Sequence, residues 1–329
     1  GRLSDIDVLP TLGMDDLWHY RNKGEFIAAR AEDGTIRLGY HGDDGSMVPV
    51  TDCPIQHPLS LRLLPIVEEI ATAYGLPLAQ LITRVSPHDG TALVILVCWE
   101  WHEGLPHAAR ELAARVPELT GVLCSRVRGR SVVRRTLADV LVGEGALRQH
   151  LGPWEFIVSA ESFFQVNNTQ AARMLEVAAA YTGDMSQTTF ADAYCGVGTF
   201  LVPLAGHAAQ ALGIEEHPIA LRDAAENLKL HALPDVKLYE GRVETVMPRL
   251  LRRGREIDTI ILDPPRKGAG RAVLETLTGL NVRRVVLVSC DPSTLGRDAG
   301  DLAALGYTIR SVQPIDMCPQ TWHVETIAL

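Results

Sequence analysis

The pattern of apolar and polar positions changes near residue 160. Before it, apolar runs and turns alternate irregularly, with glycine–aspartate turns at 42–45 and 89–90. The pattern predicts strands over 92–99 and 121–128 and helices over 61–74 and 107–115. Such a mixture is typical of an α+β domain with a mostly antiparallel sheet.

After residue 160, strand-length and helix-length apolar patterns alternate regularly. Strands are predicted over 189–193, 210–215, 236–240, 257–263 and 282–290, and helices over 198–206, 218–231, 271–279 and 295–305. This alternation predicts a doubly wound α/β sheet. The last two strands, 307–315 and 323–329, are too close for a crossover helix, so we expect them to pair antiparallel.

The composition is that of a globular chain long enough for two domains: 329 residues, 47% hydrophobic and 22% charged. Its net charge of −9 argues against non-specific coating by nucleic acid, but leaves room for a local basic groove. Arginines gather in the run 126–135, although such a run by itself is more typical of a solvated face. No segment reaches 18 uninterrupted apolar residues. We therefore expect no membrane partner. The scattered single thiols point to the cytoplasm.

Cysteine usage indicates a reducing compartment, because the six thiols are scattered and none forms a C-x-x-C pair. We accordingly predict no metal site. Cys290 differs from the others because it ends the apolar run 282–290 and precedes Asp291 and Pro292. Open α/β sheets place ligands and chemistry at such strand ends, where a thiol can act as a nucleophile. For an isolated cysteine, a buried structural thiol is the alternative interpretation.

The glycine-rich turn DAYCGVGTF (192–200) follows the first strand of the second half. Its glycines allow a ligand to approach the backbone closely, and Glu215, at the end of the next strand, can hold ribose hydroxyls. The turn lacks the G-x-G-x-x-G of dinucleotide sites. It therefore favours S-adenosylmethionine over NAD or FAD.

The predicted strand 257–263 leads into Asp263-Pro264-Pro265-Arg266. The two prolines make this loop rigid, so it can present the carboxylate of Asp263 and the guanidinium of Arg266 to a cleft. Enzymes that methylate exocyclic amines usually carry an aromatic residue after the two prolines. Arg266 occupies that place, which argues against amine methylation.

Together these motifs resemble the RNA 5-methyluridine methyltransferases, the uracil-C5 enzymes of transfer and ribosomal RNA. The resemblance covers the chain from about residue 15 to its end. It rests on the ordered motifs FFQVNN (163–168), DAYCGVGTF, GIE (213–215), LDPPRKG (262–268), SCDPSTLGRD (289–298) and PQTWHVE (319–325). Upstream, WHYRNK (18–23) and the turn at Cys53 match the family's central domain.

The resemblance implies the roles of particular residues. Cys290 would be the nucleophile, which adds to carbon 6 of uracil, and Glu325 the general base, which removes the proton from carbon 5. The positions implied for the cofactor are Gln165, Tyr194, Glu215 and Asp263, and those for the substrate are Arg266 and Phe163.

Three departures from the family pattern matter. Asp291 stands where many members have asparagine, and its charge is expected to raise the pKa of the Cys290 thiol unless Arg297 or another cation offsets it. Of the family's four cluster cysteines only Cys53 is present, so we expect no iron–sulfur cluster. Many relatives also carry an N-terminal β-barrel domain before the region of resemblance. The start at Gly1 leads us to expect a trimmed chain rather than a lineage that has dispensed with the cluster.

The sequence therefore predicts a central α+β RNA-binding domain over 1–160 and a Rossmann-like, S-adenosylmethionine-dependent catalytic domain over 161–329. We expect a monomer that methylates carbon 5 of a uridine, in ribosomal rather than transfer RNA, along a basic track from Arg21, Lys23 and the run 126–135.

Two alternatives stay open. One is a cytosine-C5 or other RNA methyltransferase, although the Pro264-Pro265-Arg266 loop lacks the expected Pro-Cys pair. The other is a catalytically weak RNA-binding module, against which the intact Cys290 and Glu325 argue.

Overall fold

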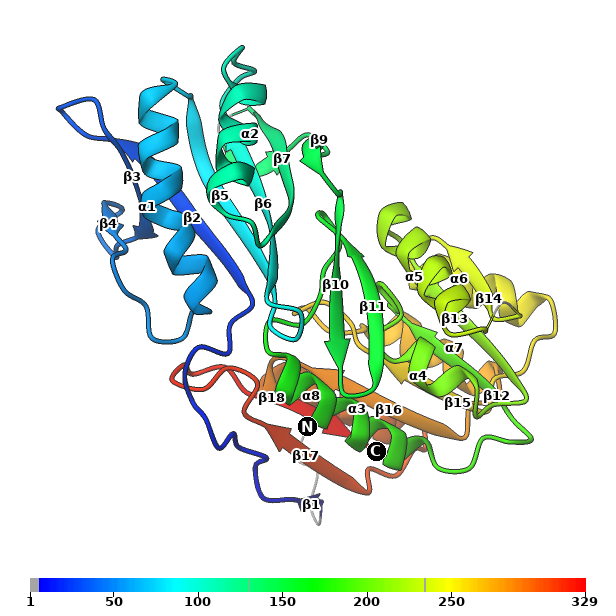
Figure 1. Cartoon of the computed structure of the whole chain (residues 1–329). Helices are drawn as coiled ribbons and strands as arrows, with labels where there is room; N and C mark the ends of the chain where they lie inside the picture. The colour runs from blue at the N-terminus through cyan, green and yellow to red at the C-terminus, as the bar shows by residue number, and fades with distance from the viewer. Residues whose placement is uncertain (1–5, 130, 234) are drawn as a thin grey trace. The chain divides into compact units, whose positions relative to one another are not determined.

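The computed structural model describes residues 6–129, 131–233 and 235–329, without the side chains of 131–135 (Figure 1). The chain forms two compact units. Unit 1 comprises the described part of Gly1–Asp16 together with Leu151–Trp154 and Ser162–Leu329, and unit 2 comprises Leu17–His150 and Glu155–Glu161. Residues 6–16, which the predicted boundary at 160 assigned to the first domain, therefore lie with the second half of the chain.

Unit 1 is built on an eight-stranded sheet in the order β1-β17-β18-β16-β15-β12-β13-β14. Its strands are β1 (Asp7–Val8), β12 (Thr189–Ala193), β13 (Gln210–Glu215), β14 (Lys237–Glu240), β15 (Thr259–Leu262), β16 (Arg284–Ser289), β17 (Ser311–Ile315) and β18 (Glu325–Ala328). Strands β12 to β16 are parallel, as the alternating pattern predicts. Strand β18 runs antiparallel to β17, also as predicted, and it inserts between β17 and β16.

Helices cover this sheet: α3 (Asn168–Thr182), α4 (Leu201–Ala205), α5 (Pro218–Leu230), α6 (Val243–Arg252), α7 (Arg271–Gly279) and α8 (Pro292–Ala304). Helices α6, α7 and α8 share one apolar core with alternate strand residues such as Ala191 and Ala193. Helix α3 contacts β15 to β18 and crosses in front of them in Figure 1. The sequence analysis identified neither α3 nor α6. Each has a local cause: Asn167 caps α3, and α6 buries Val243, Val246, Met247 and Leu250 along one face.

Unit 2 holds a second sheet, in the order β4-β3-β2-β5-β6-β7-β8, with β9 paired to β7. Its strands are β2 (Lys23–Arg30), β3 (Ile36–His41), β4 (Met47–Pro49), β5 (Leu78–Ser86), β6 (Thr91–Cys98), β7 (Leu119–Arg128), β8 (Ser131–Arg135) and β9 (Asp139–Gly143). Its described pairs are antiparallel except β6 with β7, as expected of a mostly antiparallel sheet.

Two helices, α1 (Pro58–Ala73) and α2 (Leu105–Arg115), share a second apolar core with strands of this sheet. Both helices confirm the predicted ones within a few residues. Strands β10 (Ala146–Leu151) and β11 (Trp154–Ser159) form a separate two-stranded sheet.

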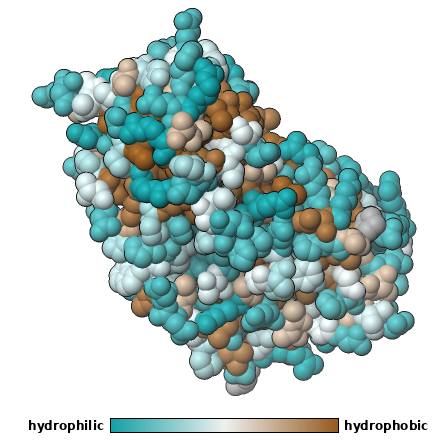
Figure 2. Space-filling model, viewed as in Figure 1, coloured by the Kyte–Doolittle hydropathy of each residue, from teal (hydrophilic) through white to brown (hydrophobic). Residues whose placement is uncertain are grey.

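The face in Figure 2 is mostly hydrophilic, with apolar side chains showing between the polar ones. Among the described residues, no helix has both the length and the apolar character needed to cross a membrane.

Candidate active site

Four parallel strands of unit 1 end at one edge of the sheet, where polar residues gather. Tyr194 follows β12, Glu215 ends β13, Asp263 follows β15 and Cys290 follows β16. The chain order reverses between β12 and β15, because β13 and β14 extend the sheet on one side and β15 and β16 on the other. Ligands of open α/β sheets bind outside the carboxyl ends of the strands at such a switch point.

Strand β18 brings Glu325 to Cys290. Ser289 pairs with Thr326 in the antiparallel β16–β18 register, so the next pair along the two strands is Cys290 with Glu325. The Thr326 hydroxyl donates to the Ser289 carbonyl over 3.0 Å and fixes this register. Glu325 is buried and Cys290 is half-buried, so the thiol remains accessible beside a largely enclosed carboxyl group.

The environment makes both groups hold their protons more tightly. Burial raises the pKa of Glu325, and the charge of Asp263 raises it further, while Arg266 lowers it. Burial likewise raises the pKa of Cys290, with Glu325 and Asp263 adding to the shift and Arg266 opposing it. Burial also raises the pKa of Asp263. The site therefore holds three acidic groups, which cannot all ionise without repulsion, beside the cation Arg266.

The charge of Asp291 was expected to raise the pKa of the Cys290 thiol, but Asp291 is not among the groups that do so. Its carboxylate caps α8 and accepts a hydrogen bond from the Thr294 amide over 2.8 Å, which lowers the pKa of Asp291. The carboxylates that raise the pKa of Cys290 are Glu325 and Asp263. The opposing cation is Arg266, whereas Arg297 pairs with Asp298.

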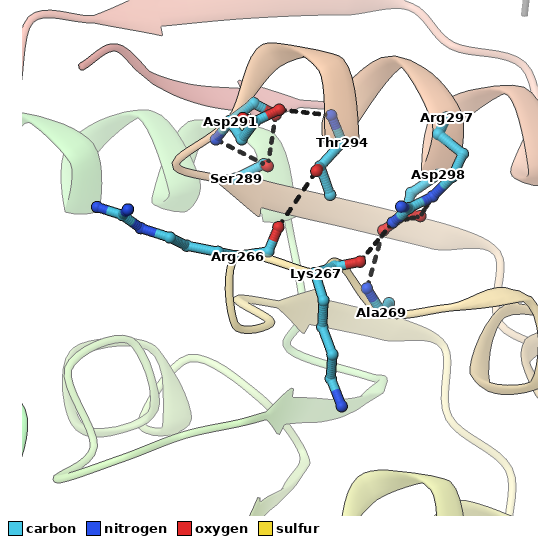
Figure 3. Close-up of polar contacts among 8 residues, drawn as sticks. All are labelled: Arg266, Lys267, Ala269, Ser289, Asp291, Thr294, Arg297 and Asp298. Atoms are coloured by element: carbon cyan, nitrogen blue, oxygen red, sulfur yellow. Dashed lines mark hydrogen bonds and ion pairs between the residues drawn. The ribbon is translucent and has the colours of Figure 1, made fainter. Parts of the chain in front are cut away.

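The loop that carries Asp263 and Arg266 is fastened to α8, the helix that begins beside Cys290 (Figure 3). The Thr294 hydroxyl donates to the Arg266 carbonyl over 3.2 Å, and Asp298 accepts from the Ala269 amide over 2.8 Å. Arg297 donates to the Lys267 carbonyl over 2.6 Å.

These hydrogen bonds hold the loop against the first turns of α8. Arg297 and Asp298 hold this loop, and neither was among the predicted site residues. The feature of the sequence that could have indicated them is an arginine next to an aspartate in the predicted helix after Cys290.

The glycine-rich turn adopts backbone conformations that leave space above it. Tyr194 has a φ of 72° and Gly196 a φ of 55°, and a Cβ added at Gly196 would meet no atom within 4 Å. Glu215 accepts hydrogen bonds from the Gly196 amide over 2.9 Å and the His217 amide over 2.7 Å. The buried Tyr194 hydroxyl has no hydrogen-bond partner among the described residues. A fixed carboxylate, an open turn and an unpartnered hydroxyl fit a nucleoside with free ribose hydroxyls. Helix α4 has only five residues, so its N-terminus contributes little to the site.

Asp192 is a site residue that the sequence analysis quoted but did not select. It is fully buried in β12, and neither carboxylate oxygen has a hydrogen-bond partner among the described residues. Burial, and then the charge of Asp263, raise its pKa well above the usual range. A strand residue read from sequence gives no indication of this, because the effect depends on which strand lies beside β12.

Two predicted residues lie apart from this group in the chain, on the segment that leads into α3. Phe163 is 68% exposed, whereas the following Phe164 is buried. Gln165 is half-buried. The roles of both Phe163 and Gln165 stay predictions.

The predicted basic track lies in unit 2 and is partly neutralised. Lys23 lies 2.5 Å from Glu25, and Arg126 lies 3.8 Å from Asp139. Arg134 and Arg135 belong to the stretch whose side chains lie outside the described residues, and so does residue 130. The track therefore stays a prediction.

The chain resembles known proteins over its whole length. Residues 150–329 match the family model "tRNA (Uracil-5-)-methyltransferase". An uncharacterized RNA methyltransferase of Halalkalibacterium halodurans is 32% identical over 343 residues, which span 100% of this chain and 74% of that protein. One of Geobacter sulfurreducens is 34% identical over 351 residues, 99% of this chain and 68% of that protein.

A solved structure shows the same fold. The Pyrococcus abyssi tRNA (uracil-54, C5)-methyltransferase, in complex with S-adenosyl-L-homocysteine, aligns with a TM-score of 0.81 at 22% identity. The alignment covers 98% of this chain and 78% of that one. The predicted Rossmann-like methyltransferase fold is thereby confirmed. Because a family model matches more than half of the chain and relatives match it from end to end, this chain belongs to the tRNA (uracil-5-)-methyltransferase family.

Proposed function

We propose that this chain methylates carbon 5 of one uridine in RNA, with Cys290 as nucleophile and Glu325 as general base. The observation that carries the proposal is the β16–β18 register, which sets the half-buried thiol opposite a buried carboxyl group. Membership of a uracil-5 methyltransferase family supports the reaction class.

The chemistry explains why the two groups are needed together. Carbon 5 of uracil is a weak nucleophile, so Cys290 adds through its sulfur to carbon 6 and shifts electron density to carbon 5. S-adenosylmethionine, when bound, supplies the electrophilic methyl group. Glu325 then removes the proton from carbon 5, and the bond between sulfur and carbon 6 breaks to restore the ring. The uridine must leave its stack to reach both groups.

The two raised pKa values suit this order of events. Cys290 and Glu325 each raise the cost of ionising the other, because two negative charges would face each other across the strand pair. When the sulfur binds carbon 6 its negative charge is lost. Glu325 can then ionise more easily, at the stage at which a base is required.

The cofactor would lie along the carboxyl edge of the sheet. Glu215, held by two backbone amides, would accept the ribose hydroxyls, and the Tyr194 hydroxyl gains a partner there. We assign Asp263 and Gln165 to the same ligand. The neighbour from Pyrococcus abyssi, crystallised with S-adenosyl-L-homocysteine, supports S-adenosylmethionine as the donor.

Arg266 and Phe163 would meet the RNA, the first as a charge near the reacting base and the second as an exposed stacking ring. The basic residues of unit 2 would bind the phosphate backbone. We further propose that the protein works in the cytoplasm as a monomer. We take ribosomal RNA as the first candidate substrate. Transfer RNA is the second candidate, and it is supported by the family name and by the similarity to the Pyrococcus abyssi enzyme, both of which specify tRNA.

Trapping with 5-fluorouridine tests the nucleophile. RNA with this base at the target has no removable proton at carbon 5, so we expect a stable protein–RNA adduct when S-adenosylmethionine is present. Cys290→Ala should form none, whereas Cys53→Ala, which removes another half-buried thiol, should form it normally. An adduct in Cys290→Ala would show that a different group attacks the ring.

The base is tested separately with Glu325→Gln on unmodified RNA. The amide keeps the shape but cannot take the proton, so methylation should stop after addition and leave an adduct that wild-type protein does not accumulate. A loss of turnover by about 10²–10⁴-fold is expected of a missing general base. Normal turnover would assign the proton to another group.

The substrate is identified by mapping 5-methyluridine in ribosomal and transfer RNA from cells with and without the gene. A single lost position in ribosomal RNA supports the first candidate, and one in transfer RNA the second. Methylated cytosine in either RNA would instead favour a cytosine-C5 enzyme. If no methylated base is lost, the chain is an RNA-binding module and the proposal fails.

A further inference from the structure

Unit 2 contains a cluster of metal-ligating side chains that the methyl-transfer reaction does not use. It consists of His88, Asp89 and His150, with a ligand-type nitrogen or oxygen atom from each within 4.8 Å of the other two. His88 and Asp89 occupy the turn between β5 and β6, and His150 lies near the end of β10. These two segments lie far apart in the chain, so no local motif marks the cluster, and the prediction of no metal site rested on the cysteines alone.

The three groups lie close enough together to share one ion. His150 Nε2 lies 3.4 Å from an Asp89 carboxylate oxygen, and the two imidazole rings have centroids 4.0 Å apart, tilted by 33°. His88 and Asp89 are exposed and His150 is half-buried, so the cluster is accessible from solvent.

The fold holds these donors in place without a bound ion. The Ser86 hydroxyl donates to Asp89 over 2.9 Å, and the turn itself is closed by a 2.9 Å bond from the Gly90 amide to the Ser86 carbonyl. On the other side, the buried Gln149 side chain donates to the Val85 carbonyl over 2.8 Å, which fastens β10 beside the end of β5. Carboxylates that ligate metal ions are commonly hydrogen-bonded in this way by a second residue.

The donor set selects the class of ion. Two imidazoles and one carboxylate suit zinc and its neighbours in the first transition series, whereas magnesium and calcium prefer oxygen ligands alone. With three protein donors, one position is left for water.

We propose that His88, Asp89 and His150 form a binding site for one divalent transition ion, with zinc as its occupant. The ion ties the β5–β6 turn to β10 within unit 2. Ser86 acts as a positioning residue, because it orients Asp89 and does not touch the ion.

Titration of the full-length, reduced protein with Co²⁺ and with Zn²⁺ tests the proposal. We expect one tight site with visible d–d absorption for Co²⁺ and no sulfur-to-metal charge-transfer band, since the donors are nitrogen and oxygen. His150→Ala and Asp89→Asn should each weaken binding by about 100-fold or more, and Ser86→Ala by roughly tenfold. His107→Ala, which removes an exposed imidazole of α2, is the matched control and should bind as wild type.

Four outcomes would overturn the proposal. One is the absence of any tight site, and another is equal affinity in wild type, His150→Ala and Asp89→Asn. The third is a charge-transfer band, which would place the ion on a cysteine. If His150→Ala lowers thermal stability equally with and without Zn²⁺, the cluster is an ion pair and a stacked ring, and no metal site.

Discussion

At the scale of single residues, Arg266 is the group that opposes the rise in pKa of both Cys290 and Glu325. Replacing it by glutamine removes that charge, so the pKa of both groups should rise further and adduct formation should move to higher pH. A rise of one pKa unit lowers the thiolate fraction near neutral pH about tenfold. The rate of adduct formation on 5-fluorouridine RNA, measured against pH, checks this.

Arg266→Lys keeps the charge and should keep most of the wild-type pH profile. If Arg266→Gln changes only the KM for RNA and leaves the pH profile of the bound complex unchanged, then Arg266 contacts RNA and does not tune the thiol. The two roles are thus separable in one experiment.

The raised pKa of the buried Asp192 carboxyl group should make the stability of the protein depend on pH. Its pKa is raised in the folded chain, so the folded state keeps a proton that the unfolded chain releases above about pH 4. Its stabilising contribution is therefore complete at low pH and is lost as the pH rises toward the folded pKa. Asp192→Asn removes this loss. The free energy of unfolding of the variant, relative to wild type, should increase between about pH 5 and pH 8, by on the order of 1 kcal/mol or more.

Urea unfolding at the two pH values measures that difference. Asp184→Asn is the control, because hydrogen bonds from Ser186 lower the pKa of Asp184. Its contribution is lost only as the pH falls below about 4, so this variant should keep the wild-type difference between pH 5 and pH 8. An Asp192→Asn variant with the same pH dependence as wild type would mean that Asp192 is ionised in the folded protein.

The residue scale also shows what could be learned from the sequence. The family resemblance named Cys290 and Glu325 together in advance, whereas the strand pattern by itself predicted only that 307–315 and 323–329 pair antiparallel. Asp192, Arg297 and Asp298 could not be identified in advance, because their effects depend on burial and on contacts between β12, α8 and the 263–270 loop. No local pattern encodes which distant backbone amide a helical aspartate will meet.

At the scale of elements, Gly268 allows the loop that carries Asp263 and Arg266 to pack closely against α8. Its φ of 82° is left-handed, and an added Cβ would collide with Arg297, Asp298 and Thr294. Gly270 has a similar φ of 77°, but its Cβ would meet nothing within 4 Å. Gly270→Ala should therefore cost about 1–2 kcal/mol of unfolding free energy for the backbone alone. Gly268→Ala should cost more and should also slow adduct formation.

The comparison of the two alanine variants isolates the loop contact from the cost of the backbone conformation. Equal losses of stability and equal adduct rates in both would show that the loop does not depend on α8. Chemical unfolding and single-turnover trapping supply the two measurements.

Strand order is the part of the fold that the sequence left open. Alternation identified β12, β13, β15 and β16, since buried parallel strands read as continuous apolar runs. It could not show that β18 would insert between β16 and β17, because register and neighbour choice depend on side-chain packing across the sheet. That insertion is what carries Glu325 to Cys290.

At the scale of the whole molecule, each unit has a core of its own. One core joins α1 and α2 to strands of unit 2, and the other joins α6, α7 and α8 to strands of unit 1. Separate cores allow separate unfolding transitions, since each can melt while the other keeps its buried apolar surface. Calorimetry on the full chain should therefore resolve two transitions.

Ligands identify which transition belongs to which unit. S-adenosylhomocysteine should stabilise unit 1 alone, by about 2.7 kcal/mol at a concentration one hundred times its Kd, and Zn²⁺ should stabilise unit 2 alone. Glu215→Gln should abolish the first shift and keep the second, and His150→Ala should do the reverse. A single transition that both ligands raise would mean that the units unfold as one. A shift by S-adenosylhomocysteine that survives Glu215→Gln unchanged would place the ribose elsewhere than at the end of β13.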